Sequence, residues 1–510
     1  MGQQPSPGAQ CARIGHNALM PPPLARSLAP QLPAGLAAAL PADALLTEPE
    51  RLGPYECDGL SMYRQPPLAV ALPYTAGQVQ AVLRICHAAG VPVVPRGAGT
   101  GLAGGALPQA DAVLLSLARL KRIVRIDPLA RIAVVESGVR NAAISEAAAA
   151  HGLYYAPDPS SQIACSIGGN VAENSGGVHC LKYGLTVHNV LGVRGFLADG
   201  TPLSLGGEAP DDSGLDLLAL MIGSEGLLAV VTEVTVRLLP RPRVAQVVMA
   251  AFASVEDAAE AVAGIIGEGI VPAGLEMMDA LATRAVEDFA QVGYPLDAAA
   301  ILLAESDGTA EEVADEIARI EAVCRRHGAA SLTTSASEAE RLKLWAGRKA
   351  AFPAVGRITP DYYCMDGTIP RKHLSAVLRR IAELSAEHGL ACANVFHAGD
   401  GNLHPLIFYD ANQPGDVERA EAFGLDILRV CVAAGGVITG EHGVGVEKLD
   451  AMCVQFSTPE LATFHAVKAA FDAAGLLNPG KAVPTLHRCA EMGAVHVHGG
   501  RLLHPQLPRF

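Results

Sequence analysis

The pattern of apolar and polar residues predicts an alternation of strands and helices that falls into two parts. In the first part, apolar runs at 68–73 and 91–94 flank a segment at 77–89 whose apolar residues recur at helical spacing. These three segments predict a β-α-β unit, and Gly90 marks the end of its helix. Further elements are expected as strands at 114–117, 132–136 and 233–239 and as a helix at 141–151.

The second part begins after Pro240-Arg-Pro242, which is typical of a domain boundary. Strand-like segments at 244–252 and 300–305 alternate there with helix-like segments at 255–268 and 310–327. This alternation predicts an α/β sandwich made of one sheet and flanking helices.

A glycine-rich loop directly follows the β-α-β unit. Five of the eleven residues of Pro95–Gly105 are glycine, which lets a backbone turn sharply and present successive N–H groups to a phosphate. The spacing Gly99-x-Gly101-x-x-Gly104 matches the fingerprint of a Rossmann fold, which requires a helix after the loop. Glycine and proline at 104–108 oppose such a helix, and 111–117 reads as a strand. The sequence favours a pyrophosphate loop of another fold, with an ordinary glycine-rich turn as the alternative.

Composition narrows the class of protein. The 510 residues, half of them hydrophobic and 18% charged, indicate a globular chain of two or three domains. A net charge of -14 argues against a nucleic-acid binder, although a local basic pocket stays open. The eleven cysteines include no C-x-x-C motif, so we expect no iron–sulfur cluster or zinc ribbon held by this chain alone, and a reducing compartment. No apolar run is long enough to predict a membrane span, and the prolines at 21–23 disfavour a signal peptide.

A second constellation lies in the second part of the chain. His397 and His404 frame a tight Gly-Asp-Gly-Asn turn, and Gly440-Glu-His-Gly443 follows downstream. Two histidines and a glutamate are a frequent ligand set for a divalent metal with an open coordination position. The alternative is that these histidines have only a structural role.

Several motifs together resemble one family. They are Pro95–Leu102, Asp158–Ser161, Ser166–Asn170, Asn174–Gly177, Lys182–Gly184 and Gly223–Gly226, in this order. The chain is thereby similar to FAD-linked oxidases of the vanillyl-alcohol-oxidase or PCMH type. Within that family it most resembles the catalytic subunits of glycolate oxidases (glycolate dehydrogenases), which are related to D-lactate and D-2-hydroxyglutarate dehydrogenases. Residues 361–370 and the tail 485–489 favour the glycolate group.

The resemblance implies an α+β fold. We expect an N-terminal arm at 1–52 and a PCMH-type FAD-binding domain of two subdomains at 53–242. An α/β sandwich cap with the metal-type site should span 243–475, and a C-terminal segment at 476–510 should return to the FAD domain.

The resemblance also implies a non-covalent FAD, since no histidine stands where covalent attachment would occur. The residues expected at its pyrophosphate are Pro95, Arg96, Gly97, Ala98, Gly99, Thr100, Gly101 and Leu102. Those expected along the rest of the cofactor are Pro157, Asp158, Ser161, Gly168, Gly169, Asn174, Gly177, Gly226, Val231 and Asn402. Ala229 departs from the glycine that relatives usually carry there.

The remaining site residues follow from the same resemblance. A divalent metal, zinc or manganese, would be held by His397, His404 and Glu441, with His442 as the general base and Arg348 as the clamp for the substrate carboxylate. The hydroxyglutarate enzymes carry a lysine where this chain has Cys364 and an asparagine where it has Leu406. Both departures favour a small substrate with one carboxylate.

The implied function is oxidation of glycolate to glyoxylate, and also of D-lactate to pyruvate, by hydride transfer to flavin N5. Electrons would pass to a second FAD-type subunit, an iron–sulfur subunit and quinone rather than to NAD. We expect a cytoplasmic protein that meets the inner face of the membrane only through these partners. A stand-alone D-lactate dehydrogenase and a non-catalytic flavin-binding assembly subunit are the alternatives.

Overall fold

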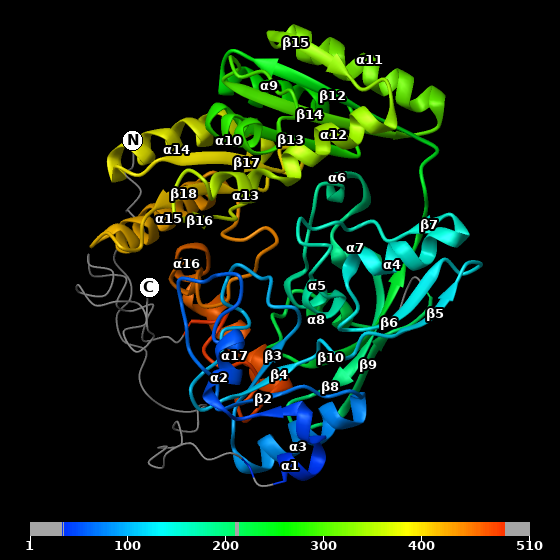
Figure 1. Ribbon diagram of the computed structural model, residues 1–510, viewed down its shortest axis with the longest axis vertical. Coiled ribbons are helices and arrows are strands. Elements are labelled where there is room, and N and C mark those ends of the chain that lie inside the picture. Colours follow the sequence, from blue (N-terminus) through cyan, green and yellow to red (C-terminus); the bar gives the residue numbers. More distant parts are fainter. Residues whose placement is uncertain (1–32, 34, 210–213, 485–510) are drawn as a thin grey trace, which may run out of the picture.

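The computed structural model describes residues 33, 35–209 and 214–484, and Figure 1 shows their arrangement. A small sheet in the lower part has the strand order β1-β2-β4-β3, in which β2, β4 and β3 are parallel. Its strands are β1 (Leu45–Leu46), β2 (Ala69–Ala71), β3 (Val93–Arg96) and β4 (Val113–Ser116).

The predicted β-α-β unit is present in this sheet. Helix α3 (Ala76–Ala89) joins β2 to β3, and the Thr75 side chain caps its start by accepting from the backbone N–H of Gln78. Gly90 ends the helix with a φ of 65°, a conformation that favours glycine. Residues 36–46, expected in the N-terminal arm, instead pack on this sheet, because β1 pairs with β2 and Leu36, Leu40 and Leu46 are buried. Helix α1 (Leu36–Ala39) lies in this stretch, and α2 (Pro49–Leu52) follows it.

A five-stranded antiparallel sheet completes the first domain, with the order β5-β6-β10-β8-β9. Its strands are β5 (Ile123–Asp127), β6 (Ile132–Glu136), β8 (Val190–Phe196), β9 (Pro202–Gly206) and β10 (Val230–Arg237). Around it lie α4 (Asn141–Ala148), α5 (Ile167–Glu173), α6 (Cys180–Tyr183), α7 (Thr186–Asn189), α8 (Leu217–Met221) and the short strands β7 (Leu153–Tyr154) and β11 (Leu239–Pro240). The two sheets confirm the expected pair of subdomains.

The second domain is built on a seven-stranded antiparallel sheet with the order β15-β12-β14-β13-β17-β18-β16. Its strands are β12 (Val244–Phe252), β13 (Gly274–Asp279), β14 (Ala300–Gly308), β15 (Ala329–Thr334), β16 (Asp361–Cys364), β17 (Cys392–Phe396) and β18 (Pro405–Tyr409). Its helices are α9 (Val255–Gly267), α10 (Ala280–Ala290), α11 (Ala310–Arg326), α12 (Glu338–Lys349), α13 (Ala351–Val355), α14 (Leu374–His388) and α15 (Asp416–Ala433).

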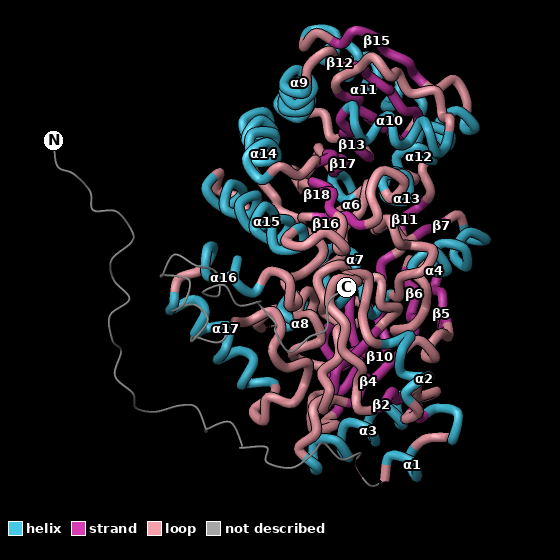
Figure 2. Tube along the Cα trace, turned by 60° about the vertical axis from the view of Figure 1, so that its left-hand side comes forward, coloured by secondary structure: helices cyan, strands magenta, loops and turns pink. Residues whose placement is uncertain are grey.

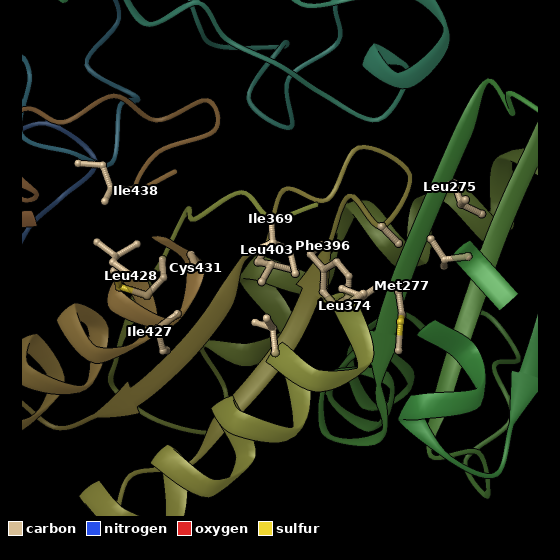
Figure 3. Close-up of a cluster of buried hydrophobic side chains, with 14 of the residues drawn as sticks. Leu275, Met277, Ile369, Leu374, Phe396, Leu403, Ile427, Leu428, Cys431 and Ile438 are labelled. Carbon is tan, nitrogen blue, oxygen red and sulfur yellow. The ribbon is translucent and has the colours of Figure 1, made fainter. Parts of the chain in front are cut away.

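Helices cover both faces of this sheet, which confirms the expected sandwich. Alternate residues of a strand point to opposite faces, so Val248 and Ala250 join the core of α9, α11, α14 and α15, whereas Val247 and Met249 join that of α10, α12 and α13. Figure 3 shows part of the first core, where Phe396 of the sheet lies against Leu374 of α14.

The chain returns to the first domain after α15. The backbone N–H of Val446 donates to Ala103 O at 2.9 Å, and Lys468 Nζ donates to Leu227 O at 2.6 Å. Contacts with the first domain therefore begin well ahead of residue 476, where the returning segment was expected to start. Helices α16 (Leu449–Gln455) and α17 (Thr458–Phe471) carry this return, and the segment after α17 reaches the small sheet, where the backbone N–H of Val93 donates to Leu476 O at 2.8 Å. Most of the tail expected at 476–510, including 485–489, falls outside the described residues.

None of the helices in the described part of the chain has both the length and the apolar character required to span a membrane.

The two domains also meet through a partly buried histidine. His179 Nδ1 lies 2.8 Å from Asp158 Oδ2 in the first domain, and its Nε2 lies 3.2 Å from Glu305 Oε1 on β14. Burial alone would lower the pKa of His179, but the two carboxylates outweigh it and raise this pKa well above the ordinary value. Glu305 also pairs with Arg341 at 2.7 Å, so it keeps a partner when His179 is neutral.

We expect His179→Gln to destabilise the protein by about 2 kcal/mol, the worth of a charge-assisted hydrogen bond. Since the folded pKa is raised, this stability is fully present below the unfolded pKa and is lost as the pH rises through the folded pKa. Thermal melting of wild type and variant should therefore differ most at acidic pH and converge at alkaline pH. The exposed His151→Gln is the matched control, and a difference that grows toward alkaline pH would contradict the role.

Candidate functional site: a cavity between the two domains

A cavity of about 390 Å³ lies where the two domains meet. All eight residues of the glycine-rich stretch 95–102 line it. The chain leaves β3 at Arg96, and Gly99 then takes a φ of 74° at a point where a Cβ would collide with the Arg96 guanidinium. No helix starts within the described residues 97–112, and β4 follows instead, so the Rossmann alternative is excluded.

The second glycine-rich block lines the same cavity and lies against the first, since a Cβ on Gly97 would meet Ser166 Oγ at 2.4 Å. Ser166 caps α5 by accepting from the backbone N–H of Gly169 at 3.3 Å. A Cβ on Gly168 would lie 2.7 Å from Ser137 Cβ, so only glycine lets the start of α5 approach the sheet this closely. Further predicted cofactor residues on the wall are Ser161, Gly168, Gly169, Gly226 and Val231, and Ala229 also lines it.

Five predicted cofactor residues do not belong to the described cavity lining, namely Pro157, Asp158, Asn174, Gly177 and Asn402. Their contacts are with other residues outside that lining. Pro157 O accepts from Asn141 Nδ2, Asp158 pairs with His179, and Asn174 Oδ1 accepts from the backbone N–H of Val187. Gly177 packs against Asp158, and Asn402 Oδ1 accepts from Thr368 Oγ1.

The cavity has the features that FAD requires. A donor-rich backbone loop without Cβ atoms suits a pyrophosphate, and a long run of glycines and small residues gives space for a flat ring system. Residues of the second domain close the far end of the cavity: Lys349, Phe352, Pro353, His404, Glu441 and His442. The phosphate-binding loop and the histidine–glutamate cluster thus share one space.

His397, His404 and Glu441 converge as predicted. His397 follows β17 and His404 precedes β18, and the turn between them is closed by the backbone N–H of His397 donating to Asn402 O. Nε2 of His397 lies 3.3 Å from Glu441 Oε1, and Nε2 of His404 lies 3.0 Å from the same oxygen. Gly401 allows the turn with its φ of 83°.

The other ring nitrogens of these histidines are held in place. His397 Nδ1 lies 2.7 Å from Glu276 Oε1, and His404 Nδ1 lies 3.2 Å from Met365 O. A hydrogen bond at Nδ1 leaves the Nε2 lone pair directed at the cluster, which is how metal-binding histidines are usually oriented.

The carboxylates of the cluster favour a positive charge between them. Burial disfavours the charged imidazoles, yet Glu276 and Glu441 outweigh it and raise the pKa of His397 well above its ordinary value. Burial is likewise outweighed at His404, where Cys364 and Glu441 raise the pKa to about 10. A divalent ion placed among these atoms would stabilise the same carboxylates with both imidazoles neutral, so the donor set fits a metal.

His442 also lines the cavity, beside this cluster. Its ring stacks on that of His404 with centroids 5.0 Å apart, and its Nδ1 is buried with no hydrogen-bond partner among the described residues. Burial is the largest cause that lowers the pKa of His442, to about 4, so the imidazole is neutral and able to accept a proton.

Asp366 fixes the loop that carries Glu441 and His442. Its carboxylate accepts from the backbone N–H groups of Gly440, Glu441 and His442, at 2.9 to 3.2 Å. Although burial raises its pKa, His442 and Lys448 lower it to about 2.

Arg348 lies behind the cluster rather than on the described cavity wall. Its side chain is 2% exposed, and Arg348 Nε donates to Glu276 Oε2 at 2.9 Å. Nη2 lies 2.7 Å from the same oxygen but outside hydrogen-bond geometry, so this nitrogen stays available. The chain of contacts runs from Arg348 through Glu276 to His397.

Sequence reasoning missed Glu276 and Asp366. Glu276 interrupts the apolar strand Gly274–Asp279, and a charged residue within such a run was the one signal that could have indicated a function. Asp366 carried no motif that pointed to three backbone donors.

Comparisons with known proteins agree with this geometry. Residues 67–206 match the family profile "FAD binding domain", and residues 241–482 match "FAD linked oxidases, C-terminal domain". The chain is 61% identical to "Glycolate oxidase subunit GlcD" of Escherichia coli (strain K12), over 91% of this chain and 93% of that protein. It is 38% identical to the protein of the same name from Bacillus subtilis (strain 168), over 84% and 91%.

More distant relatives include "D-lactate dehydrogenase" of Archaeoglobus fulgidus, 32% identical over 82% of this chain and 91% of that one. Among solved structures, p-cresol methylhydroxylase with bound substrate aligns with a TM-score of 0.74 at 18% identity, covering 89% of this chain and 96% of that one. This likeness shows the fold.

Proposed function

Because the chain belongs to the family of FAD-linked oxidases, we propose that it oxidises glycolate to glyoxylate with bound FAD, as the catalytic subunit of a glycolate oxidase. The observation that carries this proposal is the single cavity that joins the glycine-rich loops to His404, Glu441 and His442. An assembly subunit without activity would not need this cluster. The lower identity to D-lactate dehydrogenases makes a stand-alone enzyme of that kind the second choice.

The glycine-rich loop, the histidine–glutamate cluster and His442 have different roles in the proposed reaction. The backbone N–H groups of 96–102 hold the FAD pyrophosphate, and FAD when bound supplies the hydride acceptor at flavin N5. His397, His404 and Glu441 would hold a divalent metal, which would supply a Lewis acid for the substrate hydroxyl. His442 takes the hydroxyl proton on Nδ1, which lacks a hydrogen-bond partner among the residues that the structure describes, and the cap residues around it exclude water.

The substrate end of the site favours a small acid. Cys364 on β16 and Leu406 on β18 are directly paired across the sheet, and both are buried. A thiol and an isobutyl group offer no cation or amide to a second carboxylate. Glycolate and D-lactate fit this environment better than a dicarboxylic hydroxyacid.

The chain acts within a multi-subunit assembly, in keeping with relatives that are named as subunits. The partners that the family resemblance favours are a second FAD-type subunit and an iron–sulfur subunit that lead electrons to quinone. Contact with the inner face of the membrane would come through these partners.

A flavin-bleaching assay tests the proposed function. Anaerobic addition of glycolate should bleach the flavin absorbance, D-lactate should do so as well, and L-lactate and D-2-hydroxyglutarate should not. Failure of every hydroxyacid to bleach the flavin would refute the proposal, and bleaching by D-lactate alone would favour the second choice.

The glycine loop gives a direct prediction for cofactor binding. Gly99→Val places a branched side chain at a φ of 74° and against Arg96, so we expect purified protein with most of its FAD lost. Gly207→Ala is the matched control, because a Cβ there would meet nothing within 4 Å. Absorbance of released FAD per chain measures the effect, and full FAD content in Gly99→Val would count against the loop assignment.

Arg348→Lys distinguishes two roles for the arginine. If Arg348 binds the substrate carboxylate, the loss of its planar fork should raise the KM for glycolate about tenfold with metal content unchanged. If it only positions Glu276, metal content should fall while KM changes little. Steady-state kinetics combined with metal analysis separate these results, and we expect the first.

A further inference from the structure

Cys364 places a thiol beside the histidines of the cavity, and no step of the proposed reaction uses its sulfur. Cys364 ends β16, the edge strand of the seven-stranded sheet, and Figures 1 and 2 show β16 and β18 at the end of this sheet nearest the first domain. Cys364 pairs with Leu406 of β18, and His404, two positions ahead of Leu406, falls on the same face of the sheet. The register therefore directs a thiol and an imidazole to one place.

The thiol, His404 and His442 lie close enough to share an ion. Cys364 Sγ donates to Met365 O at 3.4 Å, and His404 Nδ1 lies 3.2 Å from the same oxygen. The ring of His442 is nearly parallel to that of His404, with 10° between their planes. The sulfur and one nitrogen of each histidine all lie within 4.8 Å of one another. Metal–sulfur and metal–nitrogen bonds are about 2.0 to 2.3 Å long, so a small rotation of the side chains lets one ion contact all three.

A buried nitrogen gives a second reason to expect a ligand here. His442 Nδ1 is buried and has no hydrogen-bond partner in the described part of the chain. Such a nitrogen costs free energy, and coordination to a metal removes that cost. Cys364 is a free thiol that is 6% exposed. Both histidines line the cavity, so an ion can reach them from there.

We propose that Cys364, His404 and His442 form a second metal position, which binds a soft, thiophilic ion such as cadmium or copper(I). It shares only His404 with the proposed catalytic set of His397, His404 and Glu441. A thiolate with two imidazoles selects soft ions, whereas a set that includes a carboxylate oxygen also suits harder ions such as manganese. The thiol proton leaves to solvent as the metal–sulfur bond forms.

Occupation of this position stops the proposed reaction, and this consequence alone rests on the proposed function. A neutral imidazole has one lone pair to give, so His404 cannot complete both sets at once. His442, once coordinated, cannot take the proton of the substrate. Flavin reduction is therefore sensitive to soft metal ions.

Cadmium binding to the full chain with FAD tests the site without any substrate. A cadmium–thiolate bond absorbs in the ultraviolet, so titration of the chelator-treated protein should give a saturable band in the difference spectrum. Cys364→Ser should lose this band, and manganese should not produce it. His442→Ala keeps the thiol and should weaken cadmium binding about 100-fold or more, since loss of a group that only supports a ligand already costs about 10- to 100-fold.

Two further variants locate the ion. Cys324→Ser removes a buried thiol of α11 outside the described cavity lining and should keep the band and its affinity. Glu441→Gln removes the carboxylate of the other set and should keep the band as well. Wild-type affinity in Cys364→Ser or in His442→Ala, or loss of the band in Glu441→Gln, overturns the proposal. Released FAD shows that each variant is folded.

Inhibition tests the consequence. With manganese present, cadmium should slow the anaerobic reduction of the flavin by glycolate in wild type and Cys324→Ser alike, over the concentrations that produce the band. Cys364→Ser should need about tenfold or more cadmium, relative to its own rate without cadmium. Equal inhibition of Cys364→Ser contradicts the consequence. Failure of glycolate to reduce the flavin without cadmium concerns the proposed function alone, because the band is measured without substrate.

Discussion

His442→Ala should retain its FAD and slow the anaerobic reduction of the flavin by glycolate by about 10²- to 10⁴-fold, the usual worth of a positioned general base. The imidazole lines the cavity beside the histidine–glutamate cluster, and its Nδ1, which has no hydrogen-bond partner in the described part of the chain, can accept a proton. The loop itself should survive the substitution, because Asp366 holds it through the backbone N–H of residue 442. Stopped-flow bleaching with glycolate gives the rate, and released FAD gives the cofactor content.

A matched histidine elsewhere shows whether the effect is local. His388 is a partly buried histidine on α14 that stacks on Phe423, remote from the cavity lining, and His388→Ala should reduce its flavin at the wild-type rate. The base assignment fails if His442→Ala is reduced as fast as wild type. Loss of FAD from His442→Ala would instead indicate that His442 has a structural role.

The main elements were predictable because their signals are local. The spacing in α3, the cap at Gly90 and the apolar runs of β12 and β14 are set by neighbours in sequence, and the structure has these elements within a few residues of the expected bounds. The absence of a helix after the loop was also predictable, since Gly104, Gly105 and Pro108 oppose one locally. The cavity lining confirms that all of 95–102 faces one space.

What the sequence could not predict depends on contacts between distant segments. Glu276 reaches His397 across 121 positions, and Asp366 holds residue 442 across 76, so neither partner follows from spacing. The contact of the Arg348 guanidinium with Glu276 also joins segments that are far apart in the sequence, so it could not be predicted from spacing. Asp158 was predicted at the cofactor on motif grounds, whereas the structure pairs it with a histidine that also contacts the second domain.

These long-range contacts explain why the site spans two domains. The first domain supplies the glycine-rich walls, and the second supplies the ligand set, with Glu276 on β13 fixing the first histidine. The chain then returns through Val444 and Gly445, whose backbone N–H groups donate to Glu225 in the first domain. The loop with Glu441 and His442 is therefore held by Asp366 in the second domain and by Glu225 in the first.

Glu441→Gln should abolish metal binding and slow flavin reduction by glycolate about 10³-fold, because the cluster loses its only ligand charge and the substrate hydroxyl loses its Lewis acid. Glu441 Oε1 is the oxygen that both histidines approach, and Glu276 orients one of them. Glu276→Gln should keep a weaker site, with metal affinity reduced about 10- to 100-fold. Metal content by elemental analysis and titration of the chelator-treated protein measure both effects.

The exposed Glu387→Gln is the matched control and should bind metal as wild type does. Added zinc or manganese should restore activity to chelated wild type, and to Glu276→Gln at higher concentration, but not to Glu441→Gln. The different response of the two variants to added metal distinguishes a metal ligand from a residue that positions a ligand. Equal metal content in wild type and Glu441→Gln, with equal rates of flavin reduction, would remove the metal from the mechanism and leave His397 and His404 as partners of a buried carboxylate.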